Sequence, residues 1–173
     1  LSLAWRMKQG AAELSAVSLV AGLAVCDCLK DIGLSGVCLK WPNDVMSPVG
    51  KLAGILVETK STGLECLHVV IGIGINIHNT SAVNAQVEQP VADIGTMMGS
   101  NLDRTSLSAK LLSELSCALE KFNLSGFSDC VQKWNKRDAY MGRVVTCTIG
   151  DQKIQGQGLG VDDSGAYLVR DGC

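Results

Sequence analysis

Five consecutive residues, Lys40-Trp-Pro-Asn-Asp44, gather side chains that could bind a metal–phosphate ligand, and a further lysine, Lys51, follows seven residues after Asp44. The carboxylate of Asp44 could hold Mg²⁺, and the lysine ammonium groups could meet anionic oxygens. A Pro-Asn-Asp sequence is more often only a turn, because proline fixes its own φ and Asn and Asp hydrogen-bond locally. On their own, these residues leave a phosphate site and a plain turn both open.

A second segment that could bind a nucleotide is Gly72-Ile-Gly-Ile-Asn76. Its glycines allow a ligand to approach the backbone, and the amide of Asn76 offers a donor and an acceptor to the edge of a base. A Gly-x-Gly pair is a weak indication of dinucleotide binding, since such a turn should lead into a helix and this run continues as a strand. The two segments together indicate a nucleotide-using enzyme of unspecified type.

Three segments, taken in order, resemble the signature of the biotin–protein ligases. They are Lys40-Trp-Pro-Asn-Asp44, Lys51-Leu-Ala-Gly-Ile-Leu-Val-Glu58 and Val70-Ile-Gly-Ile-Gly-Ile-Asn76, with the spacing typical of that family. The resemblance extends over essentially the whole chain. Trp5-Arg6 is similar to the region just after the family's glycine-arginine loop, and the sequence from Gly142 onward resembles its SH3-like C-terminal domain.

The resemblance implies a role for each polar residue of these segments. Lys51 would contact the biotin carboxylate and stabilise the negative charge that develops as this carboxylate attacks the α-phosphorus of ATP. Asp44 would hold Mg²⁺ on the phosphates and so neutralise the departing pyrophosphate. Lys40 and Asn43 would position the nucleotide, and Asn76 would face its adenine side. Lys51 and Asp44 are thus the expected catalytic residues, and Asp44 the expected metal ligand.

The resemblance also implies that Gly54 and Ile55 line the biotin pocket, through the backbone and through apolar contact. Simpler interpretations stay open for three of the residues named so far. Trp41 and Ile55 could be ordinary core residues, and Lys40 could be an ordinary lysine at the end of a strand.

The implied reaction has two steps. Biotin and ATP give biotinyl-5'-AMP and pyrophosphate, and a lysine of a biotin-dependent carboxylase subunit then attacks the mixed anhydride. The expected acceptor is the biotin carboxyl carrier protein subunit of acetyl-CoA carboxylase. Two alternatives stay open: a lipoate-type acyl-adenylate ligase on the same fold, and a catalytically incomplete fragment that acts only as a binding or regulatory module.

The resemblance further implies features outside this sequence. A glycine- and arginine-rich loop that clamps biotin and shields the adenylate from water is expected upstream of Leu1. Binding to DNA is expected only if a helix-turn-helix domain precedes the chain. A homodimer is a further expectation from the family.

The elements that must position these residues follow from hydrophobic periodicity. Apolar residues at three- and four-residue steps predict a helix over 14–31 that ends before Gly33. Thr105 is the expected N-cap of a second long helix, which Gly126 terminates. The other expected elements are strands over 37–41, 52–58, 66–76, 144–149, 153–156 and 166–169, a short helix over 128–137, a turn over 42–44, and loops over 60–63 and 78–90.

These elements predict an α+β fold, with a mixed, largely antiparallel sheet backed by helices and a partial SH3-like β-barrel at the C-terminus. The resemblance implies that the first part is a class II synthetase-like catalytic core. We expect the catalytic core over residues 1–138 and the SH3-like domain over 139–173.

The composition supports a packed globular domain and excludes several classes of protein. Only 18% of the residues are charged and the formal net charge is −2, with no run of Lys or Arg that would indicate nucleic-acid binding. The most apolar stretch, 14–29, is too short and too interrupted for a membrane span. The eight cysteines form no C-x-x-C pair, and with His68 and His78 they form no zinc pattern, so we expect reduced thiols in a cytoplasmic protein.

Overall fold

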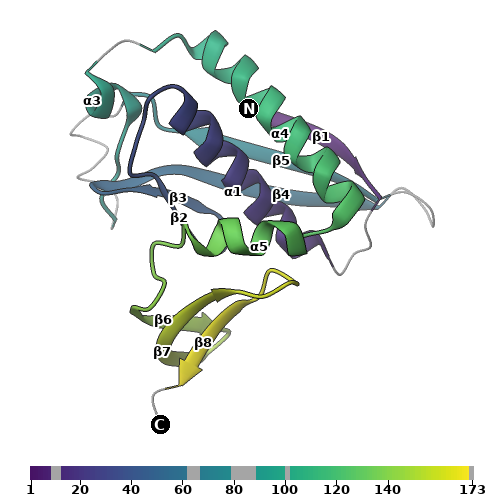
Figure 1. The fold of residues 1–173 in the computed structure, drawn as a ribbon, viewed down its shortest axis with the longest axis vertical. Helices are drawn as coiled ribbons and strands as arrows, with labels where there is room; N and C mark the ends of the chain where they lie inside the picture. The colour runs from purple at the N-terminus through teal and green to yellow at the C-terminus, as the bar shows by residue number, and fades with distance from the viewer. Residues whose placement is uncertain (9–12, 62–66, 79–88, 100–101, 172–173) are drawn as a thin grey trace.

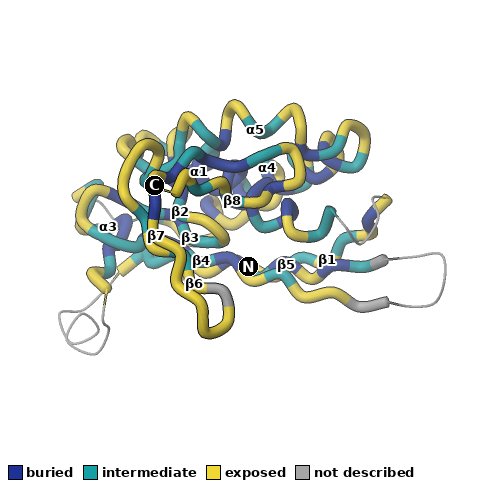
Figure 2. The backbone as a smooth tube through the Cα atoms, turned by 90° about the horizontal axis from the view of Figure 1, so that it is seen from below, coloured by how far each residue is buried: buried dark blue, intermediate teal, exposed yellow. Residues whose placement is uncertain are grey.

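The computed structural model describes residues 1–8, 13–61, 67–78, 89–99 and 102–171, in which a layer of helices covers one face of a large sheet and a small second sheet follows (Figure 1). Seen from below, the helices form one layer and the strands of the large sheet another (Figure 2). The fold is therefore α+β, as predicted from the sequence.

Within the described residues, the larger sheet has five strands in the order β1-β5-β4-β3-β2, and neighbouring strands are antiparallel. The strands are β1 (Ser2–Met7), β2 (Cys38–Lys40), β3 (Asp44–Ser47), β4 (Gly50–Ser61) and β5 (Leu67–Ile75). Two isolated parallel bridges, Leu39 with Asp138 and Lys51 with Val91, add short segments to this sheet. The sheet is therefore mixed but largely antiparallel.

Helix α1 (Leu14–Asp31) is the centre of the hydrophobic core. Twelve of its 18 residues are buried, because the sheet lies against one side of it and α4 (Arg104–Ser125) packs against another. Helix α4 is amphipathic and buries a stripe of residues at three- and four-residue steps: Leu107, Leu111, Leu115, Leu119 and Phe122. The remaining helices are α3 (Ile94–Met98) and α5 (Ser128–Asn135).

A three-stranded antiparallel sheet follows α5, with the order β6-β7-β8. Its strands are β6 (Val144–Ile149), β7 (Gln152–Val161) and β8 (Tyr167–Asp171). The small sheet fits the predicted SH3-like module. In Figure 1 it lies beyond α5, at the opposite end of the molecule from α4.

The predicted elements are present, with corrected boundaries. The strand expected over 52–58 runs from Gly50 to Ser61. Lys60 and Ser61 therefore belong to the strand and not to the loop expected over 60–63, whose residues 62 and 63 lie outside the described part. Most of the loop expected over 78–90 also lies outside it. The sequence interpretation missed β1, β3 and α3, which are short and carry little periodicity for a pattern to detect.

The predicted N-cap of α4 is wrong. Asp103, not Thr105, caps the helix, and its carboxylate accepts hydrogen bonds from the backbone N–H groups of Thr105 and Ser106 at 3.1 and 3.0 Å. A charged carboxylate is a stronger acceptor than a threonine hydroxyl, so the helix begins two residues earlier than expected.

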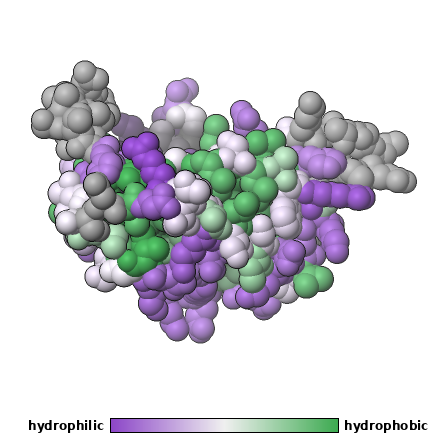
Figure 3. Space-filling view, turned by 90° about the horizontal axis from the view of Figure 1, so that it is seen from above, coloured by the Kyte–Doolittle hydropathy of each residue, from purple (hydrophilic) through white to green (hydrophobic). Residues whose placement is uncertain are grey.

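Some apolar surface stays exposed. Figure 3 shows hydrophobic side chains gathered over the middle of the face seen from above, and α4 leaves Leu112 and Leu124 40% and 79% exposed. Apolar atoms make up much of any protein surface, so this exposure does not by itself mark a binding site. No helix in the described part of the chain is long and apolar enough to cross a membrane.

Candidate active site

Four residues of the signature segments form one row across the sheet. In the strand registers Lys40 pairs with Asp44, Asp44 with Gly54, and Gly54 with Gly74. Directly paired residues project from the same face of a sheet. The neighbouring residues Leu39, Val45, Ala53 and Ile73 are buried, so they face the helices. The row therefore lies on the sheet face away from the helices.

Lys51 joins this row because of an irregularity in β4. The β3–β4 register shifts between Val45 and Met46, so that Val45 pairs with Ala53 but Met46 pairs with Lys51. Without the extra residue, strict alternation would place Lys51 on the same side as buried Ala53. A β-bulge re-aims the side chains beyond it. The bulge thus turns Lys51 onto the face that carries Asp44.

The Lys51 ammonium nitrogen lies 2.5 Å from Oδ1 of Asp44. The Asp44 side chain is 14% exposed and that of Lys51 is 37% exposed, so the carboxylate is the more enclosed partner. Gly54 lies beside the pair: a Cβ at this position would stand 3.4 Å from Cε of Lys51 and 3.9 Å from Oδ1 of Asp44. The glycine leaves the space next to both charges open.

The turn between Lys40 and Asp44 is anchored to three different elements. The hydroxyl of Ser18 on α1 donates to the carbonyl of Pro42 at 3.0 Å. The amide of Asn43 donates to the carbonyl of Ile55 on β4 at 2.9 Å, and the Ile55 N–H donates back to the Asn43 carbonyl at 2.9 Å. Together with the Trp41 contact to the small sheet described below, these bonds fix the backbone between the two charged residues.

Hydrogen bonds also hold the backbone of Lys51 in place. Its N–H donates to the carbonyl of Pro90 at 2.8 Å, and its carbonyl accepts from the N–H of Ala92 at 2.9 Å. The same carbonyl accepts a hydrogen bond from the side-chain amide of Asn76 at 3.2 Å. Asn76 therefore lies beside the ion pair and supports the backbone of Lys51.

A cavity of about 480 Å³ opens over this face of the sheet. Asp44, Lys51 and Gly54 line it together with the backbone of β5 at Gly72 and Gly74. The three glycines add no side chains to its floor, and the exposed side chain of Leu56, the register partner of Gly72, lines it beside them. Ile55 also borders the cavity, but its side chain is only 3% exposed and packs toward Gly22 of α1. The apolar body of Ile55 thus belongs to the core, and its backbone is what reaches the cavity edge.

Lys40 lies at the other end of the row and borders a second cavity of about 310 Å³, between the large sheet and β6. Its ammonium group donates to the side-chain carbonyl of Gln89 at 3.4 Å. The structure therefore brings Asp44, Lys51 and Gly54 together at one cavity and places Lys40 beside them at another.

The sequence interpretation missed several residues that shape this site, among them Ser18, Gln89 and Pro90. Ser18 carried a detectable signal, because it is a polar residue within an otherwise apolar helix. The backbone pairing of Pro90 and Ala92 with Lys51 carried none, since hydrogen bonds of the main chain leave no mark on residue type.

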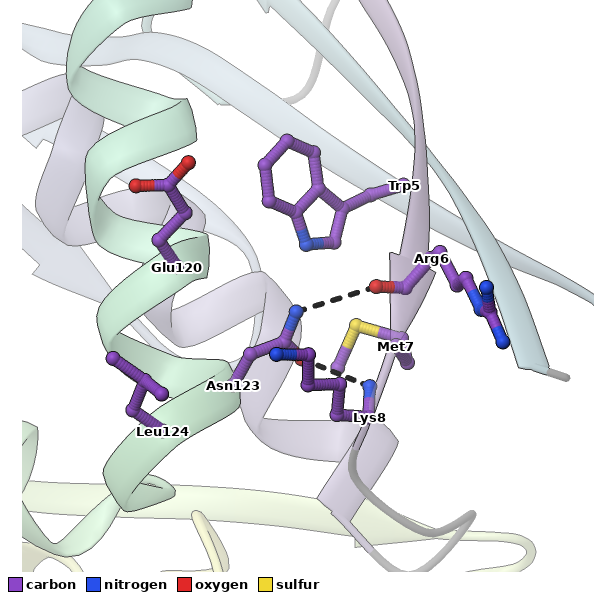
Figure 4. Close-up of a pocket in the computed structure, with 7 residues that line it drawn as sticks. All are labelled: Trp5, Arg6, Met7, Lys8, Glu120, Asn123 and Leu124. Atoms are coloured by element: carbon purple, nitrogen blue, oxygen red, sulfur yellow. Dashed lines mark hydrogen bonds between the residues drawn. The ribbon is translucent and has the colours of Figure 1, made fainter.

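A larger hollow lies elsewhere in the described structure. About 820 Å³ opens between β1 and α4, lined by Trp5, Arg6, Lys8, Glu120 and Asn123 among others (Figure 4). Asn123 closes the edge of β1 there: its amide donates to the Arg6 carbonyl at 3.2 Å and accepts from the Lys8 N–H at 3.0 Å. None of the predicted site residues lies in this hollow, so its size does not make it the active site.

The residues of this site could bind a magnesium ion only with further ligands from substrate phosphates and water. Among the described residues no group of three or more His, Cys, Asp and Glu side chains could hold a metal by itself. Mg²⁺ in phosphate-transfer sites is commonly held by one or two carboxylates with substrate phosphates and water. Asp44, partly enclosed and at the cavity edge, suits that arrangement.

Comparisons with known proteins agree with this geometry. Residues 1–76 match the sequence model of the biotin/lipoate A/B protein ligase family. The chain is 39% identical over 173 residues to the bifunctional ligase/repressor BirA of Escherichia coli, with 98% of the chain aligned; it spans about half of that protein, 52%. It is 31% identical over 177 residues to the biotin--[acetyl-CoA-carboxylase] ligase of Paracoccus denitrificans, covering 98% of the chain and 72% of that protein.

A solved structure shows the same likeness in three dimensions. The biotin protein ligase from Aquifex aeolicus, in complex with biotin and ATP, superposes with a TM-score of 0.81 at 28% identity. The match covers 98% of the chain and 70% of that protein.

Proposed function

The chain belongs to the biotin protein ligase family, and on that premise we propose that it activates biotin with ATP to biotinyl-5'-AMP and transfers the biotin to a lysine of a biotin-dependent carboxylase subunit. The observation that carries the proposal is the Lys51–Asp44 pair beside Gly54 at an open cavity. A cation and a carboxylate at one ligand-sized opening match the needs of an acyl-adenylation reaction.

Lys51 would act electrostatically. Attack of the biotin carboxylate on the α-phosphorus gathers negative charge on the reacting oxygens, and a preorganised ammonium group stabilises that charge. The main-chain bonds to Pro90, Ala92 and Asn76 hold Lys51 in place before the substrate arrives. No proton transfer by Lys51 is needed.

Asp44 would hold Mg²⁺ against the phosphates of ATP. Held there, Mg²⁺ would supply the charge neutralisation that a pyrophosphate leaving group needs. Asp44 can change partners because its present partner, Lys51, is the group that would turn toward biotin. The Lys51–Asp44 ion pair would be replaced by a contact of Lys51 with biotin and a contact of Asp44 with Mg²⁺, so neither charge would be left unpaired.

The remaining assignments divide between the two substrates. We assign Lys40, Asn43 and Asn76 to the nucleotide and Gly54 and Ile55 to biotin. Asn43 and Asn76 each donate an amide N–H group to a backbone carbonyl, and we assign their amide oxygens to the nucleotide. Ile55 would contribute through its backbone.

We propose the biotin carboxyl carrier protein subunit of acetyl-CoA carboxylase as acceptor, a homodimer as the assembly, and the cytoplasm as the location. The six cysteines in the described part of the chain are free, as expected of a reducing compartment. We further propose residues 1–138 as the catalytic core and 139–173 as the SH3-like domain, since the separate β6–β8 sheet lies wholly within the second range.

The experiment that tests the function is biotin-dependent ATP–pyrophosphate exchange, measured on this chain and on the whole protein with its upstream segment. Exchange in the whole protein supports the ligase, and exchange in that protein alone makes this chain an incomplete part of it. A folded protein without exchange would overturn the activity and favour a binding module. Competition between biotin and lipoate in the same assay separates the ligase from its lipoate-type alternative.

A further inference from the structure

The small β6–β8 sheet contacts the active-site turn at Trp41. The indole N–H of Trp41 donates to the carbonyl of Gly165 at 3.1 Å, in the tight turn that precedes β8. The ring of Tyr167, the first residue of β8, packs against the Trp41 ring with centroids 6.0 Å apart. Trp41 is thus held by two residues of the small sheet, although it belongs to the segment that carries Lys40 and Asp44.

Tyr167 is itself held in place by Asp138 and Trp134. Its hydroxyl donates to Oδ2 of Asp138 at 2.8 Å, and its ring meets that of Trp134 edge-on with centroids 6.4 Å apart. The other carboxylate oxygen of Asp138 accepts from the Tyr140 N–H at 2.9 Å. Burial, aided by the hydrogen bond to Asp138, raises the pKa of Tyr167 well above its ordinary value, so the hydroxyl stays a donor at working pH.

Asp138 lies directly beside the strand that carries Lys40. It forms a parallel bridge with Leu39. The Leu39 N–H donates to the carbonyl of Arg137 at 2.7 Å, and the Leu39 carbonyl accepts from the N–H of Ala139 at 2.8 Å. The segment around Asp138 therefore forms the outer neighbour of β2 next to Lys40.

Tyr167 is therefore linked to the chain on both sides of Lys40, directly through Trp41 and indirectly through Asp138. Its ring lies on Trp41, the residue after Lys40, and its hydroxyl bonds the segment paired with Leu39, the residue before it. Lys40 and Tyr167 also line the same cavity of about 310 Å³. A flexible lysine placed on a backbone fixed at both sides loses less freedom when it binds a phosphate.

We propose that Tyr167 is a positioning residue that sets Lys40 for the nucleotide. This inference rests on the proposed function, since it names a residue for the ATP half of that reaction. Tyr167 acts through Trp41 and Asp138 and does not touch the substrate. It lies outside the three signature segments, so the sequence interpretation gave it no role.

The test is a double-mutant cycle in the whole protein, with ATP–pyrophosphate exchange as the assay. Tyr167→Phe keeps the ring and removes only the bond to Asp138, so it should fold and raise the KM for ATP about threefold; Tyr167→Ala should raise it about tenfold. The KM for biotin should not change in either variant. In a Lys40→Ala background the effect of Tyr167→Phe on the KM for ATP should disappear, because the residue that it positions is gone.

The control is Leu168→Ala, at the next residue of β8, whose side chain is 41% exposed; its kinetics should match the wild type. Equal changes in both KM values, or an effect of Tyr167→Phe that persists without Lys40, would overturn the inference and make Tyr167 a packing residue. Absence of exchange in the wild type would count against the proposed function alone. Calorimetric titration of the same variants with ATP would then decide the positioning role.

Discussion

Lys51 and Asp44 form an ion pair, with 2.5 Å between the ammonium nitrogen and Oδ1. They belong to different strands and face each other only because the bulge in β4 turns Lys51 over. Each of these two charges is the proposed partner of a substrate group. Binding of biotin must therefore compete with Asp44 for the same cation.

This competition predicts that Asp44→Asn binds biotin more tightly than the wild type when ATP and Mg²⁺ are absent. The substitution removes the charge that holds Lys51, so the ammonium group meets the biotin carboxylate without giving up an ion pair. We expect about a tenfold lower Kd, which corresponds to about 1.4 kcal/mol. Calorimetric titration of the whole protein with biotin measures it. The same variant should lose exchange activity, and unchanged or weaker biotin binding would contradict the competition.

Lys51→Ala should reduce adenylation by a factor of about 100 or more, because it removes the charge that stabilises the transition state. ATP–pyrophosphate exchange measures the loss. Lys121→Ala, at an exposed lysine of α4, is the matched control and should keep full activity. Near-normal exchange in Lys51→Ala would remove Lys51 from the catalytic assignment.

Asn76→Asp should raise the KM for both biotin and ATP. The substitution replaces the amide donor with a carboxylate that repels the Lys51 carbonyl, so it displaces Lys51, which we propose acts where the biotin carboxylate attacks ATP. A residue that contacted only the nucleotide would change the KM for ATP alone. Asn123→Asp breaks a similar side-chain bridge to the Arg6 carbonyl, away from the site. This control should lower the free energy of unfolding and leave both KM values unchanged.

Gly54→Val should block the cavity that we assign to biotin, without unfolding the protein. The new side chain would stand against Lys51 and Asp44, where a Cβ alone already comes within 3.4 Å of Cε of Lys51. Gly74, its partner in the register, lines the same cavity but has open space at the corresponding position, so Gly74→Ala should weaken biotin binding less than Gly54→Val. Fluorescence or calorimetric titration with biotin compares the two variants at matched thermal midpoints. Normal biotin binding by Gly54→Val would place the pocket elsewhere.

The sequence predicted the longer strands and helices around this site, β4, β5, α1 and α4, but not the side of the sheet on which each residue lies. Alternation along β4 assigns Lys51 to the buried side with Ala53, and only the register shift at Val45 and Met46 reverses that assignment. A bulge depends on the pairing of two strands, which a single segment does not encode. The short strands β1 and β3 were missed for a related reason, since their pairing partners, more than their own pattern, make them strands.

Sequence patterns also could not predict which distant residues hold the site in place. Trp41 was assigned either to the signature or to the core, and the structure has it 39% exposed with its N–H bonded to Gly165. The two residues lie 124 positions apart. Residue type indicated that Trp41 needs a hydrogen-bond acceptor, but its location followed only from tertiary packing.

A charge cluster behind the site predicts a specific pH dependence of stability. Asp27 on α1 accepts hydrogen bonds from Lys133 of α5 at 2.5 Å and from Arg137 at 2.7 Å. These bonds connect α1 to α5 and to the segment around Asp138 that lies beside β2. Burial alone would raise the pKa of Asp27, but the bonds from Lys133 and Arg137 outweigh it and hold that pKa below its ordinary value of 3.8. The folded state thus favours the ionised carboxylate.

Asp27→Asn should therefore lower the free energy of unfolding by about 1 to 2 kcal/mol at pH 7, after allowance for the partial exposure of the pair. A carboxyl group with a depressed pKa stabilises the fold above its unfolded pKa, near 3.8, and loses that contribution as the pH falls through the folded value. Urea denaturation should show a difference in the free energy of unfolding from the wild type that is constant from pH 7 to about pH 4. The difference should shrink as the pH falls further to 3. Asp31→Asn, whose carboxylate is 52% exposed and lies 3.1 Å from Lys110, should change stability little at any pH. A difference for Asp27→Asn that grew on acidification would show that the carboxylate is destabilising in the folded state.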